Sequence, residues 1–140
     1  IKMKVEKISS KIGSWSLILV GIGHTITDLT SPKTESQNDF IQKMKEFPIE
    51  IMGTETNIFS FHQGFSLMMG LLLFGYGLLN ILILRNNQAS SIPTNIIIFN
   101  IIICVISFVL SIKYFFIVPI VFTGIALLGF AISLIIKLRK

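Results

Sequence analysis

One long uncharged stretch constrains this chain more than any other feature of its sequence. From Asn57 to Leu84 no side chain carries a formal charge, and the stretch ends at Arg85. A helix needs about 20 residues to cross the ~30 Å hydrocarbon layer of a membrane, so this stretch is long enough to span one. The composition agrees, because 52% of the residues are apolar and only 14% are charged, too few charges for the surface of a water-soluble domain. We therefore expect an integral membrane protein.

Three further apolar stretches have the length of membrane spans. They cover residues 12–28, 96–112 and 119–136, and with 57–84 they predict four spans in a single membrane domain over residues 1–140. The span at 96–112 is rich in β-branched residues, which favour strands in water. A lone strand in lipid would leave its backbone groups unpaired, so we expect a helix there too. The predicted fold class is all-α, an integral membrane four-helix bundle.

The polar loop between the first two spans, residues 29–56, contains a shorter helix of a different kind. Thr34 with Gln37, or Ser36 with Asp39, has the spacing of a capping box that opens a helix. The apolar residues that follow recur at helical spacing, which predicts an amphipathic helix on the membrane surface or across the mouth of the bundle. The alternative is a lid over a ligand site, formed by Phe40, Ile41, Met44 and Phe47.

The distribution of charge predicts the orientation of the spans. Eight of the 12 lysines and arginines, with Glu6 alone of the seven acidic residues, fall on the side that both termini would share. Sides rich in lysine and arginine stay in the cytoplasm, so we expect cytoplasmic termini and an outer 29–56 loop. Because these cations cap membrane spans, the net charge of +5 does not indicate a nucleic-acid partner. The eight are Lys2, Lys4, Lys7, Lys11, Arg85, Lys137, Arg139 and Lys140.

Four polar side chains near the outer ends of the first two spans form a group that suggests chemistry. His24 and Asp28 are four residues apart and share a helix face, and His62 and Ser66 have the same relation in the second span. Ionisable groups at membrane depth are costly to bury, which makes these residues candidates for a functional site.

Several kinds of site are compatible with this group. Two histidines and a carboxylate can hold a transition metal, and a pair of histidines from two helices can ligate a haem. Histidine also titrates near neutral pH and can relay protons, for example beside a bound quinone. A simpler interpretation is that each histidine bonds a neighbouring hydroxyl or carbonyl. The sequence contains no C-x-x-C-H, H-E-x-x-H, Walker-type or nucleophile-elbow motif, and so gives no support for an enzyme.

Small residues recur within the spans and predict close contacts between helices. Ser66 and Gly70 are four residues apart and lie on one face of the second span, a spacing that lets a neighbouring helix approach closely. Asn80, near the inner end of the same span, is expected to make a hydrogen bond between helices. The glycines expected at helix contacts are Gly21, Gly70, Gly124 and Gly129.

Three short motifs resemble a known family. Gly23-His24-Thr25 stands late in the first span, Met52-Gly53 precedes the second, and the second opens with the sequence FHQGF from Phe61 to Phe65. This pattern is similar to that of a family of small uncharacterised bacterial inner-membrane proteins. The resemblance implies a four-helix protein of the inner membrane and brings no activity with it. An aromatic residue often stands in that family where His62 stands here, so the resemblance does not imply a two-histidine site.

Three functional classes follow from these features. Glycine-rich faces and few buried charges favour an accessory or structural subunit of a larger membrane complex, whose partners besides the bilayer are other subunits or a second copy. One alternative is a binder of a lipid, quinone or other apolar ligand between the spans. The other is a redox protein with haem or a metal on His24 and His62. The sequence favours a channel or transporter less, because the spans have almost no charged residues near the middle of the membrane that could line a path.

Overall fold

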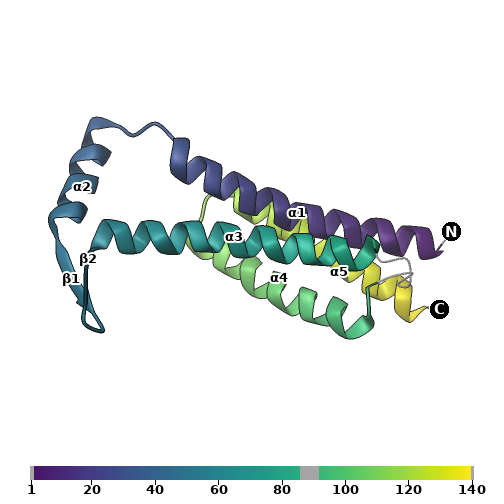
Figure 1. Cartoon of the computed structure of the whole chain (residues 1–140). Coiled ribbons are helices and arrows are strands. Elements are labelled where there is room, and N and C mark those ends of the chain that lie inside the picture. The colour runs from purple at the N-terminus through teal and green to yellow at the C-terminus, as the bar shows by residue number, and fades with distance from the viewer. Residues whose placement is uncertain (1, 86–91, 140) are drawn as a thin grey trace.

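The computed structural model describes residues 2–85 and 92–139, which form five α-helices and two short β-strands. Four helices lie side by side, and the fifth stands with the strands across one end of them (Figure 1). The turn-rich sequence from Arg85 to Asn95 predicts a connector between the second and third spans, and its residues 86–91 lie outside the described ranges. In chain order the elements are α1 (Lys2–Thr30), α2 (Glu35–Glu46), β1 (Pro48–Ile51), β2 (Thr54–Asn57), α3 (Ile58–Arg85), α4 (Thr94–Tyr114) and α5 (Ile117–Leu138).

The helices α1, α3, α4 and α5 contain the four predicted spans. Each is long and apolar enough to cross a membrane. With 28 residues in α3 and 21 in α4, these helices are about 42 and 32 Å long at 1.5 Å per residue. α1 begins at Lys2 rather than near residue 12, because nothing in the basic stretch before the span interrupts a helix. Pro119 lies in the first turn of α5, where its missing N–H leaves no helical hydrogen bond unmade.

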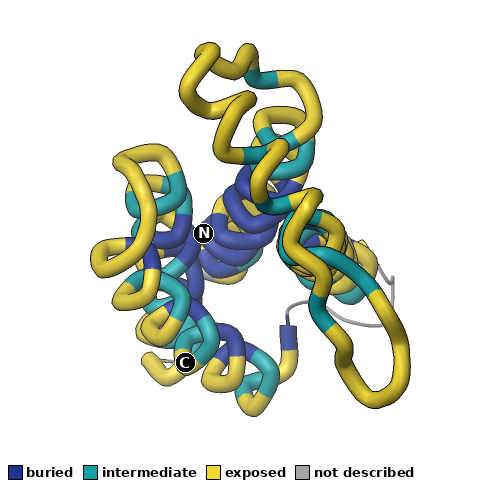
Figure 2. The backbone as a smooth tube through the Cα atoms, turned by 90° about the vertical axis from the view of Figure 1, so that its left-hand side faces the viewer, coloured by how far each residue is buried: buried dark blue, intermediate teal, exposed yellow. Residues whose placement is uncertain are grey.

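The four long helices contact one another unequally. α1 packs along both α3 and α5, and α4 packs along α5, whereas in the described part of the chain α3 and α4 pack on each other only sparsely. A view along the bundle shows the buried parts of the helices turned toward its centre and the exposed parts turned outward (Figure 2). Both termini lie at one end, which we call the terminal end. α2 and the strands lie at the other, the loop end (Figure 1).

Glycines bring α1 close to two of its neighbours. A methyl group on Gly21 would lie 2.7 Å from the carbonyl oxygen of Gly70 in α3, and one on Gly129 of α5 would lie 2.8 Å from the backbone nitrogen of Gly13. These distances leave no room for a side chain, so the approach of the backbones requires glycine. Gly124 is less confined, because its nearest neighbour is an aromatic ring of α4 at 3.2 Å.

Buried amides join α3 to α4 across the gap between them. Asn100 Nδ2 donates a hydrogen bond to Asn80 Oδ1 at 2.7 Å, and the Tyr76 hydroxyl donates to Asn100 Oδ1. Asn80 Nδ2 in turn donates to the Tyr76 carbonyl oxygen at 3.0 Å. Both asparagine side chains are buried. The interhelical hydrogen bond expected for Asn80 is therefore present, and it links two helices that pack only sparsely on each other.

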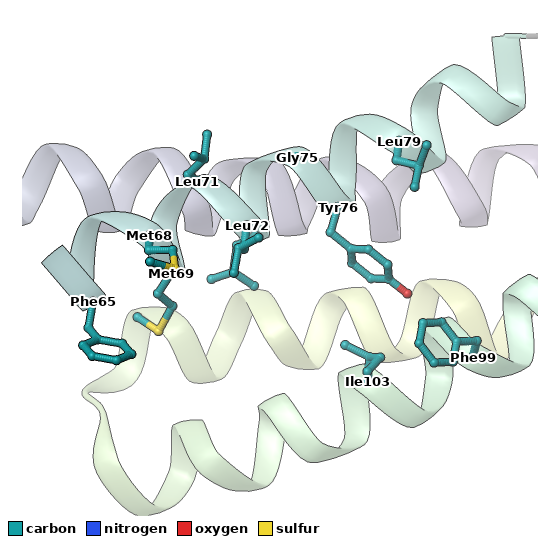
Figure 3. A pocket seen from close by; sticks show the side chains of 11 residues that line it. Phe65, Met68, Met69, Leu71, Leu72, Gly75, Tyr76, Leu79, Phe99 and Ile103 are labelled. Atoms are coloured by element: carbon teal, nitrogen blue, oxygen red, sulfur yellow. The ribbon is translucent and has the colours of Figure 1, made fainter. Parts of the chain in front are cut away.

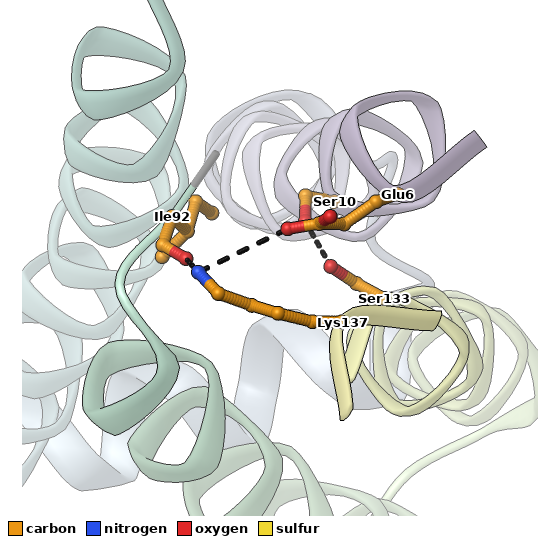
Figure 4. A network of polar contacts seen from close by, with 5 residues as sticks. All are labelled: Glu6, Ser10, Ile92, Ser133 and Lys137. Atoms are coloured by element: carbon orange, nitrogen blue, oxygen red, sulfur yellow. Dashed lines mark hydrogen bonds and ion pairs between the residues drawn. The ribbon is translucent and has the colours of Figure 1, made fainter. Parts of the chain in front are cut away.

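A second polar network ties the helices together at the terminal end (Figure 4). Glu6 of α1 is fully buried, and its Oε1 lies 3.9 Å from Nζ of Lys137 in α5. Lys137 also donates a hydrogen bond to the carbonyl oxygen of Ile92, just before α4. The hydroxyls of Ser10 and Ser133 lie 2.7 Å apart beside this pair. The network therefore fixes α1, α5 and the segment leading into α4 to one another.

The loop contains the predicted helix and also a β-hairpin that the sequence did not predict. Of the two capping boxes considered, Thr34 and Gln37 form one, with both backbone-to-side-chain hydrogen bonds present. β1 and β2 pair antiparallel around Met52 and Gly53, which have φ of 52° and 81°. Two central residues at positive φ make the tight turn that suits a hairpin. The all-α expectation is therefore wrong for residues 48–57, where Met-Gly supplies a turn.

Candidate functional site

His24 of α1 directly contacts Ser66 of α3. Its Nε2 lies 3.0 Å from Ser66 Oγ and 3.1 Å from the Ser66 carbonyl oxygen, and its ring is half-buried. The contact forms because Gly21 and Gly70, each about one turn nearer the terminal end, bring the two backbones together. Nδ1 takes part in neither hydrogen bond. The sequence-predicted residues His24 and Ser66 are thus brought together.

Asp28 forms a second contact between the same helices. One turn closer to the loop end than His24, its Oδ2 accepts a hydrogen bond from Nε2 of Gln63 in α3. In the sequence, Gln63 stands out only as part of the FHQGF motif beside His62. The signal that pairs it with Asp28 is helical spacing, because each partner lies about one turn beyond a residue of the His24–Ser66 contact.

His62 does not share a site with His24. Its side chain is exposed and lines a cavity beneath α2, whereas His24 lines cavities between the long helices. Nowhere in residues 2–85 and 92–139 do three histidine, cysteine, aspartate or glutamate side chains gather as a metal site requires. The described residues therefore do not gather the metal site considered for His24, Asp28 and His62. None of the cavities described here is lined by both histidines, as a haem held between them would require.

A cavity of about 170 Å³ lies beside His24 and is lined by all four long helices. Its walls are mostly apolar, but three hydroxyl-bearing residues of α4 and α5 line it together with the imidazole. Ser111 and Thr123 are buried in the bundle. The sequence could not connect these residues to His24, since they come from helices far away along the chain. They are Ser107, Ser111 and Thr123.

A second space of about 520 Å³, which we call the mouth, adjoins this central cavity between α1 and α5. The two spaces have four lining residues in common, namely Val20, His24, Phe115 and Pro119. Asp28 and Lys33 are the charged residues that line the mouth. His24 therefore borders both the interior of the bundle and a space lined in part by the polar loop.

On its other side the central cavity meets a wide groove between α3 and α4 (Figure 3). The groove holds about 850 Å³, is open, and has an almost wholly apolar lining. Met69 and Leu73 line both the groove and the central cavity. The groove exists because α3 and α4 pack so sparsely. Its lining includes Phe65, Met68, Leu72, Tyr76, Phe99 and Ile103.

The space beneath α2, which we call the vestibule, holds about 640 Å³. Three of the four predicted lid residues, Phe40, Ile41 and Met44, line it together with His62. The fourth, Phe47, is not among its lining residues and instead accepts a hydrogen bond from the Ile58 amide through its carbonyl oxygen. Because Asp28 and Lys33 line the vestibule as well as the mouth, the two spaces adjoin.

Comparisons of the chain with protein families, curated proteins and solved structures find no match.

Proposed function

We propose that this protein crosses a membrane four times, with both termini in the cytoplasm, and binds one amphiphilic, membrane-soluble ligand. Two features support the crossing and its direction. The outward faces of the long helices expose large apolar side chains, such as Leu71 at 66% and Leu128 at 62%, which lipid covers without cost. The terminal end carries most of the lysines and arginines of the chain, as a cytoplasmic end does.

The adjacency of groove, central cavity and mouth, which share lining residues, is the observation that carries the ligand proposal. Shared lining residues join the open apolar groove to the cavity at His24, and that cavity to the polar mouth. Such a space suits a molecule with an apolar chain and a polar end. The chain enters the groove from the bilayer between α3 and α4, and the polar end reaches His24.

The volumes and chemistry agree with a small-molecule site. Ligand pockets in proteins commonly hold about 300–1,000 Å³ behind mostly apolar walls with a few polar groups that fix orientation, and the groove holds about 850 Å³. His24 is bound to Ser66 through Nε2. When that nitrogen donates to the Ser66 carbonyl, Nδ1 is left as an acceptor for a ligand hydroxyl. The hydroxyls of Ser107 and Ser111 supply donors for a carbonyl or ester.

The cellular location is proposed on the resemblance of the three sequence motifs. That resemblance points to the inner membrane of a bacterium, where membrane lipids and isoprenoid quinones are both amphiphiles of the required kind. The two sources share one chemistry, a polar end on a long apolar chain.

The test uses two glycines of α3 as a matched pair. Gly75 lines the groove and Gly64 lines none of the spaces described above, and a Cβ atom on either would meet nothing within 4 Å. Gly75→Trp should fill the groove without disturbing the helix contacts, and Gly64→Trp should leave the groove open. The full chain is purified in mild detergent, washed free of loosely bound lipid, and analysed by native mass spectrometry followed by extraction of the ligand.

We expect the wild type and Gly64→Trp to retain one small molecule per chain and Gly75→Trp to lose it. The mass of the extracted molecule distinguishes a lipid from a quinone. Equal retention by the two variants, or no retained molecule in the wild type, would overturn the proposal. A second polypeptide lost only from Gly75→Trp would also overturn it, and would favour an accessory subunit whose partner helix fills the groove.

A further inference from the structure

We infer that the ligand of the proposed site has an acidic polar end and that Lys33 binds it. This inference rests on the proposed function and adds the chemical class of the ligand. Lys33 lies in the short connection after α1, is exposed, and lines both the mouth and the vestibule. Its ammonium group is therefore placed where the polar end of a ligand that passes His24 would emerge from the bundle.

The charges around these two spaces favour an anion. Asp28 is the acidic residue that lines them, and its Oδ2 is already engaged by the Gln63 amide. Lys33 is joined by Lys45, whose Nζ lies 5.1 Å from the centre of the Phe59 ring in the vestibule wall. The cationic groups thus outnumber the Asp28 carboxylate. The repulsion between this carboxylate and a bound anion weakens as the anion lies farther from Asp28 and closer to Lys33.

The strength of the bond that Lys33 can make also favours an acidic end. A hydrogen bond between an ammonium and an anionic oxygen is roughly twice as strong as one between neutral groups. A neutral end such as a quinone ring lacks a negative charge to pair with Lys33. Phe40, Ile41 and Met44 of α2 line the vestibule beside this lysine.

A competition between defined amphiphiles tests the inference. The full chain in an uncharged detergent is mixed with equal amounts of a phosphatidylglycerol, a phosphatidylcholine of the same chains, a free fatty acid and an isoprenoid quinone. Native mass spectrometry then counts each bound species. Lys33→Gln removes the proposed cation, and Lys43→Gln, at an exposed lysine of α2 that lines neither space, is its matched control.

We expect the acidic lipids to be retained at least tenfold more than phosphatidylcholine by the wild type and by Lys43→Gln. Lys33→Gln should reduce that ratio to less than threefold while total occupancy stays within twofold. Asp28→Asn keeps an oxygen for Gln63 but removes the negative charge, so it should raise the ratio. The balance between phosphatidylglycerol and fatty acid tells whether the acidic group is a phosphate or a carboxylate.

Equal retention of acidic and zwitterionic lipids, a preference for the quinone, or equal loss in Lys33→Gln and Lys43→Gln would overturn the inference. Those results leave the proposed function standing, provided that Gly75→Trp still abolishes binding. If Gly75→Trp retains every species as the wild type does, the bound molecules are annular lipid only. That result would overturn both the inference and the proposed function.

Discussion

Gly21 of α1 and Gly70 of α3 meet backbone to backbone, so that a methyl group on Gly21 would lie 2.7 Å from the Gly70 carbonyl oxygen and 2.6 Å from the backbone nitrogen of Phe74. Both neighbours are backbone atoms, which cannot rotate away as a side chain can. This contact sets the separation of the two helices from which His24 reaches Ser66. The glycine pair is therefore a support of the candidate site.

Gly21→Ala should destabilise the protein because the added methyl group forces α1 and α3 apart. Overpacking of this kind typically costs about 1–3 kcal/mol. Gly23→Ala is the matched control, since a methyl group there meets nothing within 4 Å and alanine is the better helix former. Unfolding of the two variants in a denaturing detergent series measures the difference. Equal stabilities would show that the helices do not approach as closely as described.

Asn100→Ala should loosen α4 from α3. The substitution removes the acceptor of the Tyr76 hydroxyl and the donor to Asn80 Oδ1, leaving the buried Asn80 and the half-buried Tyr76 without these partners. Hydrogen bonds between membrane helices contribute about 0.6 kcal/mol on average and up to about 1.7, so the loss should be about 1–3 kcal/mol. Tyr76→Phe removes one of the bonds and should cost less. Unfolding of both variants in the same detergent series shows which is less stable. A larger loss of stability in Tyr76→Phe than in Asn100→Ala would contradict the prediction.

Lys137→Met should be more damaging than a surface change because it removes the ammonium group 3.9 Å from Oε1 of the fully buried Glu6, together with the hydrogen bond to the Ile92 carbonyl oxygen. Removing one partner of a buried ion pair costs about 3–5 kcal/mol. The double variant Glu6→Gln with Lys137→Met removes both charges and should recover a large part of the loss. Arg139→Met, at an exposed residue two positions later, serves as the control. A double variant less stable than Lys137→Met alone would contradict this account of the pair.

The parts of this structure that could be predicted from sequence are those that depend on nearby residues. The apolar runs predicted the four long helices, and the Thr34–Gln37 spacing predicted the start of α2, because both signals lie within one segment. The hairpin was missed because the alternation in β1 is only four residues long and β2 is wholly polar, and because the Met52-Gly53 turn was interpreted only as a motif.

The candidate site could be predicted only in part for the same reason. Helical spacing placed His24 near Asp28 and His62 near Ser66, but it did not determine which residue of α3 faces His24. That depends on the rotation of each helix, which Gly21 and Gly70 fix by their contact. The groove depends on the sparse packing of α3 against α4. This packing involves residues far apart in the sequence, and no local pattern predicts it.

His24→Ala and His62→Ala should separate the two histidines by function. Both variants should insert into the membrane, because neither residue lies in the buried core and the apolar length of each span is unchanged. His24→Ala should lower retention of the ligand about tenfold, since it removes a polar group from the wall shared by the central cavity and the mouth. His62→Ala, at an exposed position in the vestibule, should lower it less than threefold. Retained ligand per inserted chain, counted by native mass spectrometry, is the measurement. Degradation of His24→Ala before insertion would assign that histidine to packing against Ser66, and the candidate site would lose its central polar group.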